Sequence, residues 1–249
     1  MANVLMLSEL TEAERKRRMD HFKRQLRLDL LAGRAGRWEV SSPRDELEKF
    51  RFFLQTTEAF VDEAESSEVE TLSEPVKHLP KDAQDEFWMS HYPVHWSDIF
   101  RPILRTSVVV SLATFLETFL MRHCYHVAVV IGCDSPTFGR GNLEIARKFL
   151  SANGGFNKPC ASEWNEIKAF FQIRNELVHS QQFGTVSKRK KAIEEFCENR
   201  SDSRLHHGEV EIEPQFLEYM ITQLISFVQQ LEREFKMLCE RIKSVEQAC

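Results

Sequence analysis

One short segment of the chain holds residue types that together suit chemistry on a phosphate ester. Arg174, Asn175 and His179 lie within six consecutive positions. A guanidinium presents a planar fork of N–H donors that fits phosphate oxygens, and it keeps its proton in proteins. An imidazole has an ordinary pKa near neutrality, so it can accept or donate a proton during a reaction. The segment therefore places a cation suited to a phosphate close to a group that can exchange a proton.

The segment falls near the end of a predicted helix, Ser162–Gln181, with a broad apolar face. Arg174 lies in the middle of that face, where a cation needs an anion or carbonyl groups as partners. Two anions fit this need: Glu117 in a salt bridge inside the bundle, or a phosphate held at a cleft. The apolar face comprises Trp164, Ile167, Phe170, Phe171, Ile173, Leu177 and Val178.

The polar members of the segment lie on the adjoining side of this helix. Asn175 and His179 are four residues apart and are therefore neighbours on the helix surface. Arg174 and His179 are five apart, or ~140° around an ideal helix. They can act together in three ways: Arg174 reaches round the helix, the helix end unwinds, or two subunits supply the two residues.

The elements that must position these residues are predicted to be long helices. The chain has 19 Phe but only 9 Gly and 8 Pro, and few turn-forming residues favour helices over many short strands. Gly208–Glu213 alternates apolar and acidic residues, which predicts a short strand or an extended turn. The expected helices are Glu9–Ala32, Ser42–Glu65, Ala83–Met89, Ser97–Ile131, Leu143–Asn153, Ser162–Gln181, Ser187–Asn199 and one that follows Pro214.

The last of these helices carries apolar residues at alternating spacings of four and three. This heptad period predicts a partner helix along the whole length. The partner is either another helix of the same bundle or the same helix of a second copy. The residues are Leu217, Ile221, Leu224, Val228, Leu231, Phe235, Leu238 and Ile242.

Charge and composition limit the function classes. The net charge of −5 makes the whole chain a poor general binder of polyanions, although two basic runs, Arg15–Arg18 and Lys188–Lys191, are suited to phosphates or to a solvated helix face. Val108–Ile131 is the most apolar stretch, and the polar residues within it predict a buried helix rather than a membrane span. The scattered cysteines form no CxxC pair or zinc pattern, which predicts free thiols in a reducing cytoplasm and no metal site or cofactor.

Arg174–His179 resembles the signature of the HEPN superfamily, which is an arginine, a polar residue that is commonly Asn, and a histidine after four to six intervening positions. The setting is also similar, because a long helix containing Val108–Glu117 precedes the motif and a charged helix and a C-terminal helix follow it. The resemblance covers about residues 97–245. A looser match, Arg200 with His206 or His207, lacks the Asn.

The resemblance implies an all-α protein, with a HEPN-type helical bundle at residues 97–249 and an N-terminal helical extension and connector at residues 1–96. It implies a metal-independent endoribonuclease that cleaves RNA by 2′-hydroxyl attack and works as a homodimer in the cytoplasm. The expected setting is a prokaryotic toxin–antitoxin or abortive-infection system of antiviral defence, with an antitoxin protein as partner. The alternatives are a non-catalytic RNA- or nucleotide-binding regulatory module and a purely structural helical adaptor.

The resemblance also assigns roles to residues. His179 is expected to be the general base or acid, and Arg174 to stabilise the phosphoryl oxygens. Asn175 is expected to orient His179 or a phosphate, and Glu117 to hold Arg174. Toxins silenced by a partner nucleotidyltransferase often carry Tyr two positions after the histidine, where this chain has Gln181. The residues expected to bind RNA are Lys188, Arg189, Lys190 and Lys191.

Overall fold

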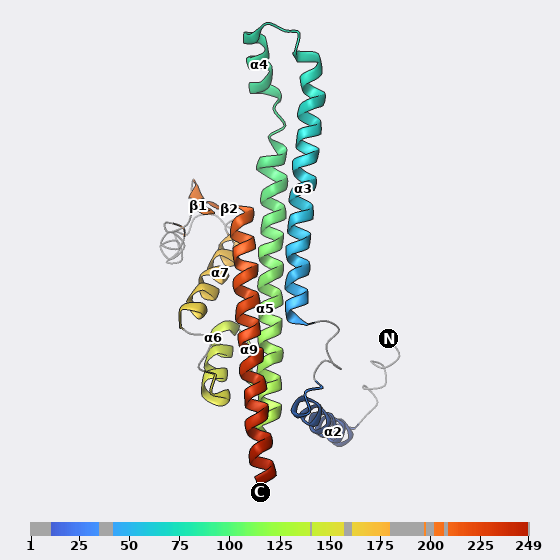
Figure 1. The fold of residues 1–249 in the computed structure, drawn as a ribbon, viewed down its shortest axis with the longest axis vertical. Coiled ribbons are helices and arrows are strands. Elements are labelled where there is room, and N and C mark those ends of the chain that lie inside the picture. The colour runs from blue at the N-terminus through green and yellow to red at the C-terminus, as the bar shows by residue number, and fades with distance from the viewer. Residues whose placement is uncertain are drawn as a thin grey trace. The chain divides into compact units, whose positions relative to one another are not determined.

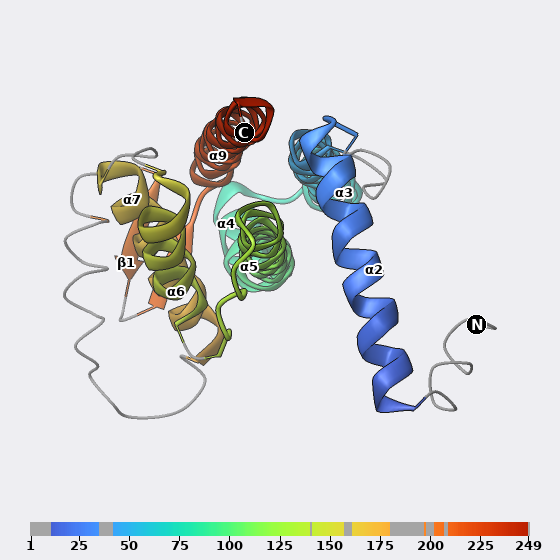
Figure 2. The ribbon, with the colours of Figure 1, turned by 90° about the horizontal axis from the view of Figure 1, so that it is seen from below.

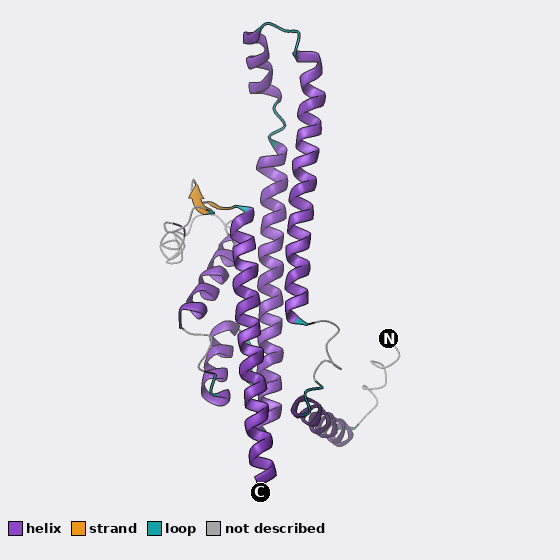
Figure 3. Ribbon diagram, viewed as in Figure 1, coloured by secondary structure: helices purple, strands orange, loops and turns teal. Residues whose placement is uncertain are grey.

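The computed structural model describes residues 11–34, 42–139, 141–156, 161–179, 197, 202–206 and 209–248. In these ranges the regular structure is helical apart from one two-stranded antiparallel sheet (Figure 3). The all-α class predicted from the sequence is therefore confirmed for the described residues.

The elements follow one another in a simple order along the chain (Figure 1). A π-helical turn, Trp96–Phe100, leads into α5, and a second one, Leu150–Gly154, follows α6. The helices are α2 (Glu12–Leu31), α3 (Pro43–Val76), α4 (Lys81–His91), α5 (Arg101–Ile131), α6 (Asn142–Phe149), α7 (Ala161–His179) and α9 (Pro214–Ala248), and the strands are β1 (Ser203–His206) and β2 (Glu209–Ile212).

Local sequence explains where the helices begin and end. Thr11 caps α2 in a reciprocal capping box, in which the Thr11 hydroxyl accepts from the Glu14 N–H at 3.3 Å and the Glu14 carboxylate accepts from the Thr11 N–H at 2.9 Å. Gly132 ends α5 with a φ of 77°, a left-handed conformation that glycine adopts at no steric cost. The predicted strand at Gly208–Glu213 is present as β2, which pairs with β1.

Helix α3 is longer than the sequence suggested. The sequence predicted that the helix from Ser42 ends at about Glu65, but α3 continues to Val76. The hydroxyl of Ser66 donates to the Asp62 carbonyl at 2.7 Å, and that of Thr71 donates to the Ser67 carbonyl at 2.8 Å. Each hydroxyl forms its hydrogen bond with a carbonyl of the preceding turn, so it does not compete for the helical backbone and the helix continues.

The chain forms two compact units that interleave along the sequence. Unit 1 comprises Met1–Pro43, Glu117–Cys160 and Phe227–Cys249, and unit 2 comprises Arg44–Leu116 and Ala161–Ser226. The helices α5 and α9 contribute residues to both units. The division into an extension at residues 1–96 and a bundle at residues 97–249 stays a prediction.

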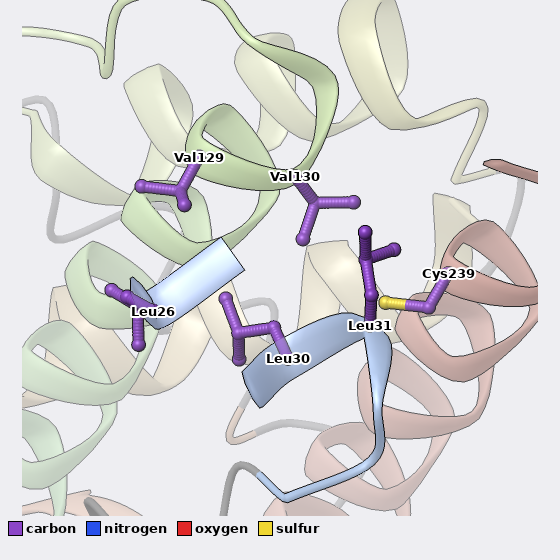
Figure 4. Close-up of a cluster of buried hydrophobic side chains, with 6 residues drawn as sticks. All are labelled: Leu26, Leu30, Leu31, Val129, Val130 and Cys239. Atoms are coloured by element: carbon purple, nitrogen blue, oxygen red, sulfur yellow. The ribbon is translucent and has the colours of Figure 1, made fainter. Parts of the chain in front are cut away.

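In unit 1 the last turns of α2 are anchored in an apolar cluster (Figure 4). Leu26, Leu30 and Leu31 pack against the end of α5 and against α9. Arg27 adds two contacts, because its Nε donates to the Val130 carbonyl at 3.1 Å and its guanidinium pairs with Glu246. The rest of α2 extends away from this cluster (Figure 2). The cluster consists of Leu26, Leu30, Leu31, Val129, Val130 and Cys239.

In unit 2, α3 runs beside the first half of α5 (Figure 1). Polar contacts connect α3 with α5 and with the π-helical turn before it: Arg105 Nε to Glu58 at 2.8 Å, Arg101 Nη2 to Asp62 at 2.7 Å, and Trp96 Nε1 to Glu68 at 2.7 Å. These contacts fix the register of the two helices, while apolar residues such as Leu54 and Leu112 are buried.

The heptad residues of α9 are buried within a single chain. Leu217, Ile221 and Leu224 are fully buried in unit 2, and Val228 and Leu231 are fully buried in unit 1. Phe235 and Ile242 are partly buried against the apolar cluster of unit 1. The prediction that this seam needs a partner is confirmed, and the partner lies in the same chain.

Among the described residues, one helical stretch within Lys81–Ile131 is long and apolar enough to cross a membrane, by length and composition alone. A core helix passes the same test, and Val109, Leu112 and Leu116 on α5 are fully covered by protein. Burial lowers the pKa of His123 to about 3 and that of His126 to about 4. These two histidines are therefore neutral near pH 7 and do not interrupt the apolar stretch with charge.

Candidate functional site

Helix α7 carries the Arg174–His179 motif and is held in unit 2 by its apolar face. Ile167, Phe170 and Ile173 are almost fully buried, and the Tyr219 hydroxyl of α9 donates to the Glu166 carboxylate at 2.9 Å. The predicted apolar face is confirmed for its N-terminal and central part. It is wrong for Val178, which is 41% exposed.

Arg174 is half-buried and is held by a neutral partner. Its Nη1 donates to Asn175 Oδ1 at 2.9 Å. Its Nε is buried and has no hydrogen-bond partner among the described residues. Within the ranges that the structure describes, no carboxylate lies within ion-pair distance of this guanidinium. Since an arginine cannot shed its proton, Arg174 keeps a positive charge that the surrounding described residues do not balance.

The direction of this guanidinium bears on how the motif works. Asn175 follows Arg174 by ~100° around the helix, and position 179 follows it by ~140°. The bond to Asn175 therefore links the Arg174 guanidinium to the residue whose angular position around α7 falls between Arg174 and position 179. Because the backbone of α7 is helical through His179, unwinding before the histidine is wrong as an explanation. The side chain of His179 lies outside the described part of the structure.

A cleft of about 650 Å³ lies next to the motif, between Leu177 of α7, the start of α5 and β2. Its two arginines are already paired. Arg105 forms a bidentate pair with Glu58 at 2.8 and 3.0 Å, donates to the Ile212 carbonyl at 2.9 Å and pairs with Glu213 at 3.2 Å. The carboxylates of Asp98, Glu211 and Glu213 also line the cleft. Its walls therefore do not offer the free positive charge that a phosphate needs.

Arg101, the second arginine that lines this cleft, is also balanced by carboxylates. It pairs with Asp62 at 2.7 Å and with Glu65 at 2.6 Å, and these contacts raise the pKa of its guanidinium. Sequence reasoning missed both cleft arginines. The available signal was spacing: Glu58, Asp62 and Glu65 share one face of α3, and Arg101 and Arg105 share one face of α5.

The other predicted site residues are placed as follows. Glu117 is half-buried on α5 and belongs to unit 1, whereas Arg174 belongs to unit 2. Its role as partner of Arg174 stays a prediction. Lys188, Arg189, Lys190 and Lys191 lie outside the described residues. In the looser match, His206 belongs to strand β1, so that match lacks the helical setting of the motif.

Buried histidine and cysteine side chains elsewhere in unit 1 have unreactive environments. The rings of Phe119, Phe156 and Phe235 surround His123 at centroid distances of 5.4, 5.7 and 5.4 Å, and burial lowers the pKa of His123 to about 3. Burial raises the pKa of the Cys124 thiol to about 12, which leaves almost no thiolate near neutral pH. His123 therefore acts as an aromatic core residue.

The described residues offer no metal site beside Arg174. Within the described residues, no group of three or more His, Cys, Asp or Glu side chains is arranged to hold a metal ion. The feature that remains is an unbalanced guanidinium beside an amide on the motif helix of an all-helical protein. No family model, curated protein or solved structure matches this chain.

Proposed function

We propose that this protein is a metal-independent endoribonuclease of HEPN type. The observation that carries the proposal is the state of Arg174, whose charge is unbalanced and whose guanidinium is turned toward Asn175. A structural arginine on a buried face needs a carboxylate or several carbonyls. Arg174 has an amide instead, which positions the group without neutralising it, so the charge stays available to a phosphate.

The proposed reaction needs one base, one acid and one group that stabilises negative charge. The RNA 2′-oxygen attacks the adjacent phosphorus, and a base removes its proton as the P–O2′ bond forms. The P–O5′ bond breaks, and an acid protonates the departing 5′-oxygen. The products are a 2′,3′-cyclic phosphate and a 5′-hydroxyl. His179 would serve as the base or the acid, because its unperturbed pKa lies near neutrality.

Arg174 and Asn175 would act on the phosphate and on the histidine. The reaction builds negative charge on the non-bridging phosphoryl oxygens. A guanidinium held in place beforehand stabilises that charge without reorganising during the reaction. Asn175 holds Arg174 through its Oδ1, and its amide N–H groups can donate to a phosphate or to position 179.

The proposed assembly is a cytoplasmic homodimer in which two α7 helices face each other. Val178 supports this arrangement, because an apolar side chain that is 41% exposed lies inside the motif. A two-fold axis would place both motifs at one RNA groove. The biological setting that we propose is a toxin–antitoxin or abortive-infection system, with an antitoxin protein as the silencing partner.

The test is incubation of the purified protein with a labelled RNA in the presence of EDTA. We expect cleavage that persists under the chelator and that yields 2′,3′-cyclic phosphate and 5′-hydroxyl ends. Loss of cleavage under EDTA with recovery on adding magnesium would refute the mechanism. RNA binding without cleavage would select the alternative, a non-catalytic HEPN-like RNA- or nucleotide-binding module.

Sedimentation tests the assembly separately. The parent protein is expected to sediment as a dimer, and Val178→Asp is expected to shift it toward the monomer. Val245→Asp is the matched control, because Val245 is 63% exposed near the end of α9 and far along the chain from the motif. A monomeric parent that still cleaves RNA would contradict the proposed dimer but not the proposed cleavage mechanism.

A further inference from the structure

Helix α2 presents an unusual concentration of positive charge to solvent. Every residue from Thr11 to Gln25 is exposed. Between Thr11 and Gln25 there are three acidic side chains and two large apolar ones, and six cationic side chains. The cations of the helix are Arg15, Lys16, Arg17, Arg18, Lys23, Arg24 and Arg27.

Four of these cations have no carboxylate partner in the described part of the chain. They are Lys16, Arg17, Lys23 and Arg24, and all four are exposed. By contrast, Arg27 pairs with Glu246. On ideal helix geometry, Lys16 and Lys23 form one row and Arg17 and Arg24 form another, ~100° away, with ~10.5 Å between the members of each row. Unbalanced cations in two rows attract a ligand with regularly spaced negative charges.

The C-terminal end of α2 anchors the helix that carries these two rows to unit 1. Leu26 and Leu30 are buried in the apolar cluster of unit 1 (Figure 4). Asp29 is buried and pairs with Arg34 at 3.1 Å. The capping box at Thr11 stabilises the opposite end. The helix is therefore capped at its N-terminus, anchored near its C-terminal end and exposed from Thr11 to Gln25. Figure 2 shows α2 as a separate helix beside the bundle.

We propose that α2 is an RNA-binding arm whose Lys16, Arg17, Lys23 and Arg24 contact the phosphates of an RNA chain independently of its sequence. The choice of RNA over other polyanions rests on the proposed function, whereas the charge argument does not. Electrostatic contacts of this kind give affinity and register without base specificity. The arm compensates for the net charge of −5 of the whole chain, which otherwise disfavours nucleic acid.

A membrane surface and a second protein fit this helix less well. A helix that lies on a membrane needs a wide apolar face opposite its basic face. Met19 and Phe22 are the only large apolar side chains between Thr11 and Gln25, and cations stand on more than one side of the helix. A flat protein surface would meet one row of these cations and leave the other unpaired.

The experiment measures RNA binding without turnover. Parent and variants carry His179→Ala, and the affinity for a labelled single-stranded RNA is followed by fluorescence anisotropy from low to moderate salt. The test variant is Lys16→Gln, Arg17→Gln, Lys23→Gln and Arg24→Gln, since glutamine keeps a good helix propensity. The matched control removes the same charge from other helices: Lys81→Gln, Lys148→Gln, Lys236→Gln and Lys243→Gln.

The expected result is a change in salt dependence. If each cation contacts one phosphate, the slope of log K against log salt should become shallower by about 2.8 in the test variant, at about 0.7 per phosphate of a single strand. The control should keep most of the parent's slope. A second variant, Lys16→Arg, Arg17→Lys, Lys23→Arg and Arg24→Lys, preserves every charge and should bind as the parent does.

Several outcomes would contradict the proposal that α2 is an RNA-binding arm. They are an equal loss of slope in test and control, loss of binding in the charge-preserving variant, parent binding to anionic phosphatidylserine vesicles but not to RNA, or self-association of the parent that only the test variant loses. The proposed function fails separately, when the protein with His179 intact does not cleave RNA in any variant. In that case a shallower slope in the test variant would still support the arm.

Discussion

Two arginines of unit 2, Arg105 and Arg174, are both half-buried and yet have opposite surroundings. Arg105 donates to both oxygens of Glu58, to the Ile212 carbonyl and to Glu213. Arg174 donates to the amide oxygen of Asn175, and its buried Nε has no hydrogen-bond partner in the described part of the chain. The first arrangement balances the charge and joins α3, α5 and β2. The second holds a charge in place without balancing it.

The difference separates a structural role from a functional one. A buried cation without an anion costs stability, and a fold retains such a group where a ligand supplies the anion. His123 shows a third solution in unit 1, because burial lowers its pKa to about 3 and the ring stays neutral. Arginine cannot follow that route. Arg174 is thus the described residue for which a bound anion gives the simplest account.

The largest expected effect is on His179. In the proposed mechanism His179→Ala removes the proton-transfer group, which typically contributes about 10²–10⁴-fold to rate. We expect cleavage of RNA under EDTA to fall by that range, while the melting temperature stays close to the parent's. The matched control is His206→Ala, which removes the histidine of the looser motif match on β1 and should leave the rate unchanged. Equal losses in both variants would contradict the assignment.

Arg174→Ala should lower cleavage by about 10²–10³-fold, the usual cost of removing one preorganised donor to a developing oxyanion. Arg174→Lys should not restore the rate, because an ammonium lacks the planar fork that contacts two phosphate oxygens. Arg147→Ala, which removes a surface arginine of α6, serves as the control for loss of charge. Single-turnover cleavage measures the rates.

Stability distinguishes Arg174 from a structural arginine. Arg174 has no described carboxylate partner, so Arg174→Ala strands no buried anion and should change the free energy of unfolding little. A drop in that free energy as large as the one expected for Arg105→Ala would place Arg174 in the same class as Arg105. Urea unfolding followed by circular dichroism makes the comparison.

Arg105→Ala should cost on the order of 3 kcal/mol of unfolding free energy, because it leaves the largely covered Glu58 carboxylate without its cationic partner. The side chains of Arg105 and Glu58 are 14% and 12% exposed. The double variant Arg105→Met with Glu58→Met removes both charges and should recover most of the loss. If Arg105→Ala unfolds at the same urea concentration as the parent, the ion-pair network does not hold α3 and α5 together.

Sequence patterns predicted most of the helices and the seam of α9, because both depend on apolar periodicity that local spacing records. They failed at the end of α3, where Ser66 hydrogen bonds back to Asp62. A serine hydroxyl favours a turn or a helix according to its context, and the sequence alone does not say which.

The site was predictable in part for a similar reason. The helix positions of Arg174 and Asn175 follow from spacing, whereas the bond between their side chains depends on rotamers and on neighbours distant in sequence. The pairing of Arg105 with Glu58 joins residues from two helices that are far apart in the chain. Val178 was assigned to the buried face because helical angle alone does not show where a covering element ends.

The smallest expected effect concerns His123, a buried basic residue that stays neutral because burial lowers its pKa. Its pKa is about 3 in the folded protein, against an ordinary value of 6.5. As the pH falls from 6.5 toward 3, the unfolded chain binds a proton and the folded chain does not. Stability is therefore lost over this window, at roughly 1.4 kcal/mol per pH unit for one such histidine.

His123→Phe should make this acid-induced loss shallower by up to that amount per pH unit, because phenylalanine fits among Phe119, Phe156 and Phe235 and takes up no proton. Urea midpoints at several pH values between 7 and 4 measure the slope. His126, with a pKa of about 4 in the fold, keeps part of the acid sensitivity in this variant. His21→Gln on the exposed face of α2 is the control and should keep the parent's slope. An unchanged slope in His123→Phe would mean that His123 takes up a proton equally in the folded and unfolded protein, which would contradict the lowered pKa.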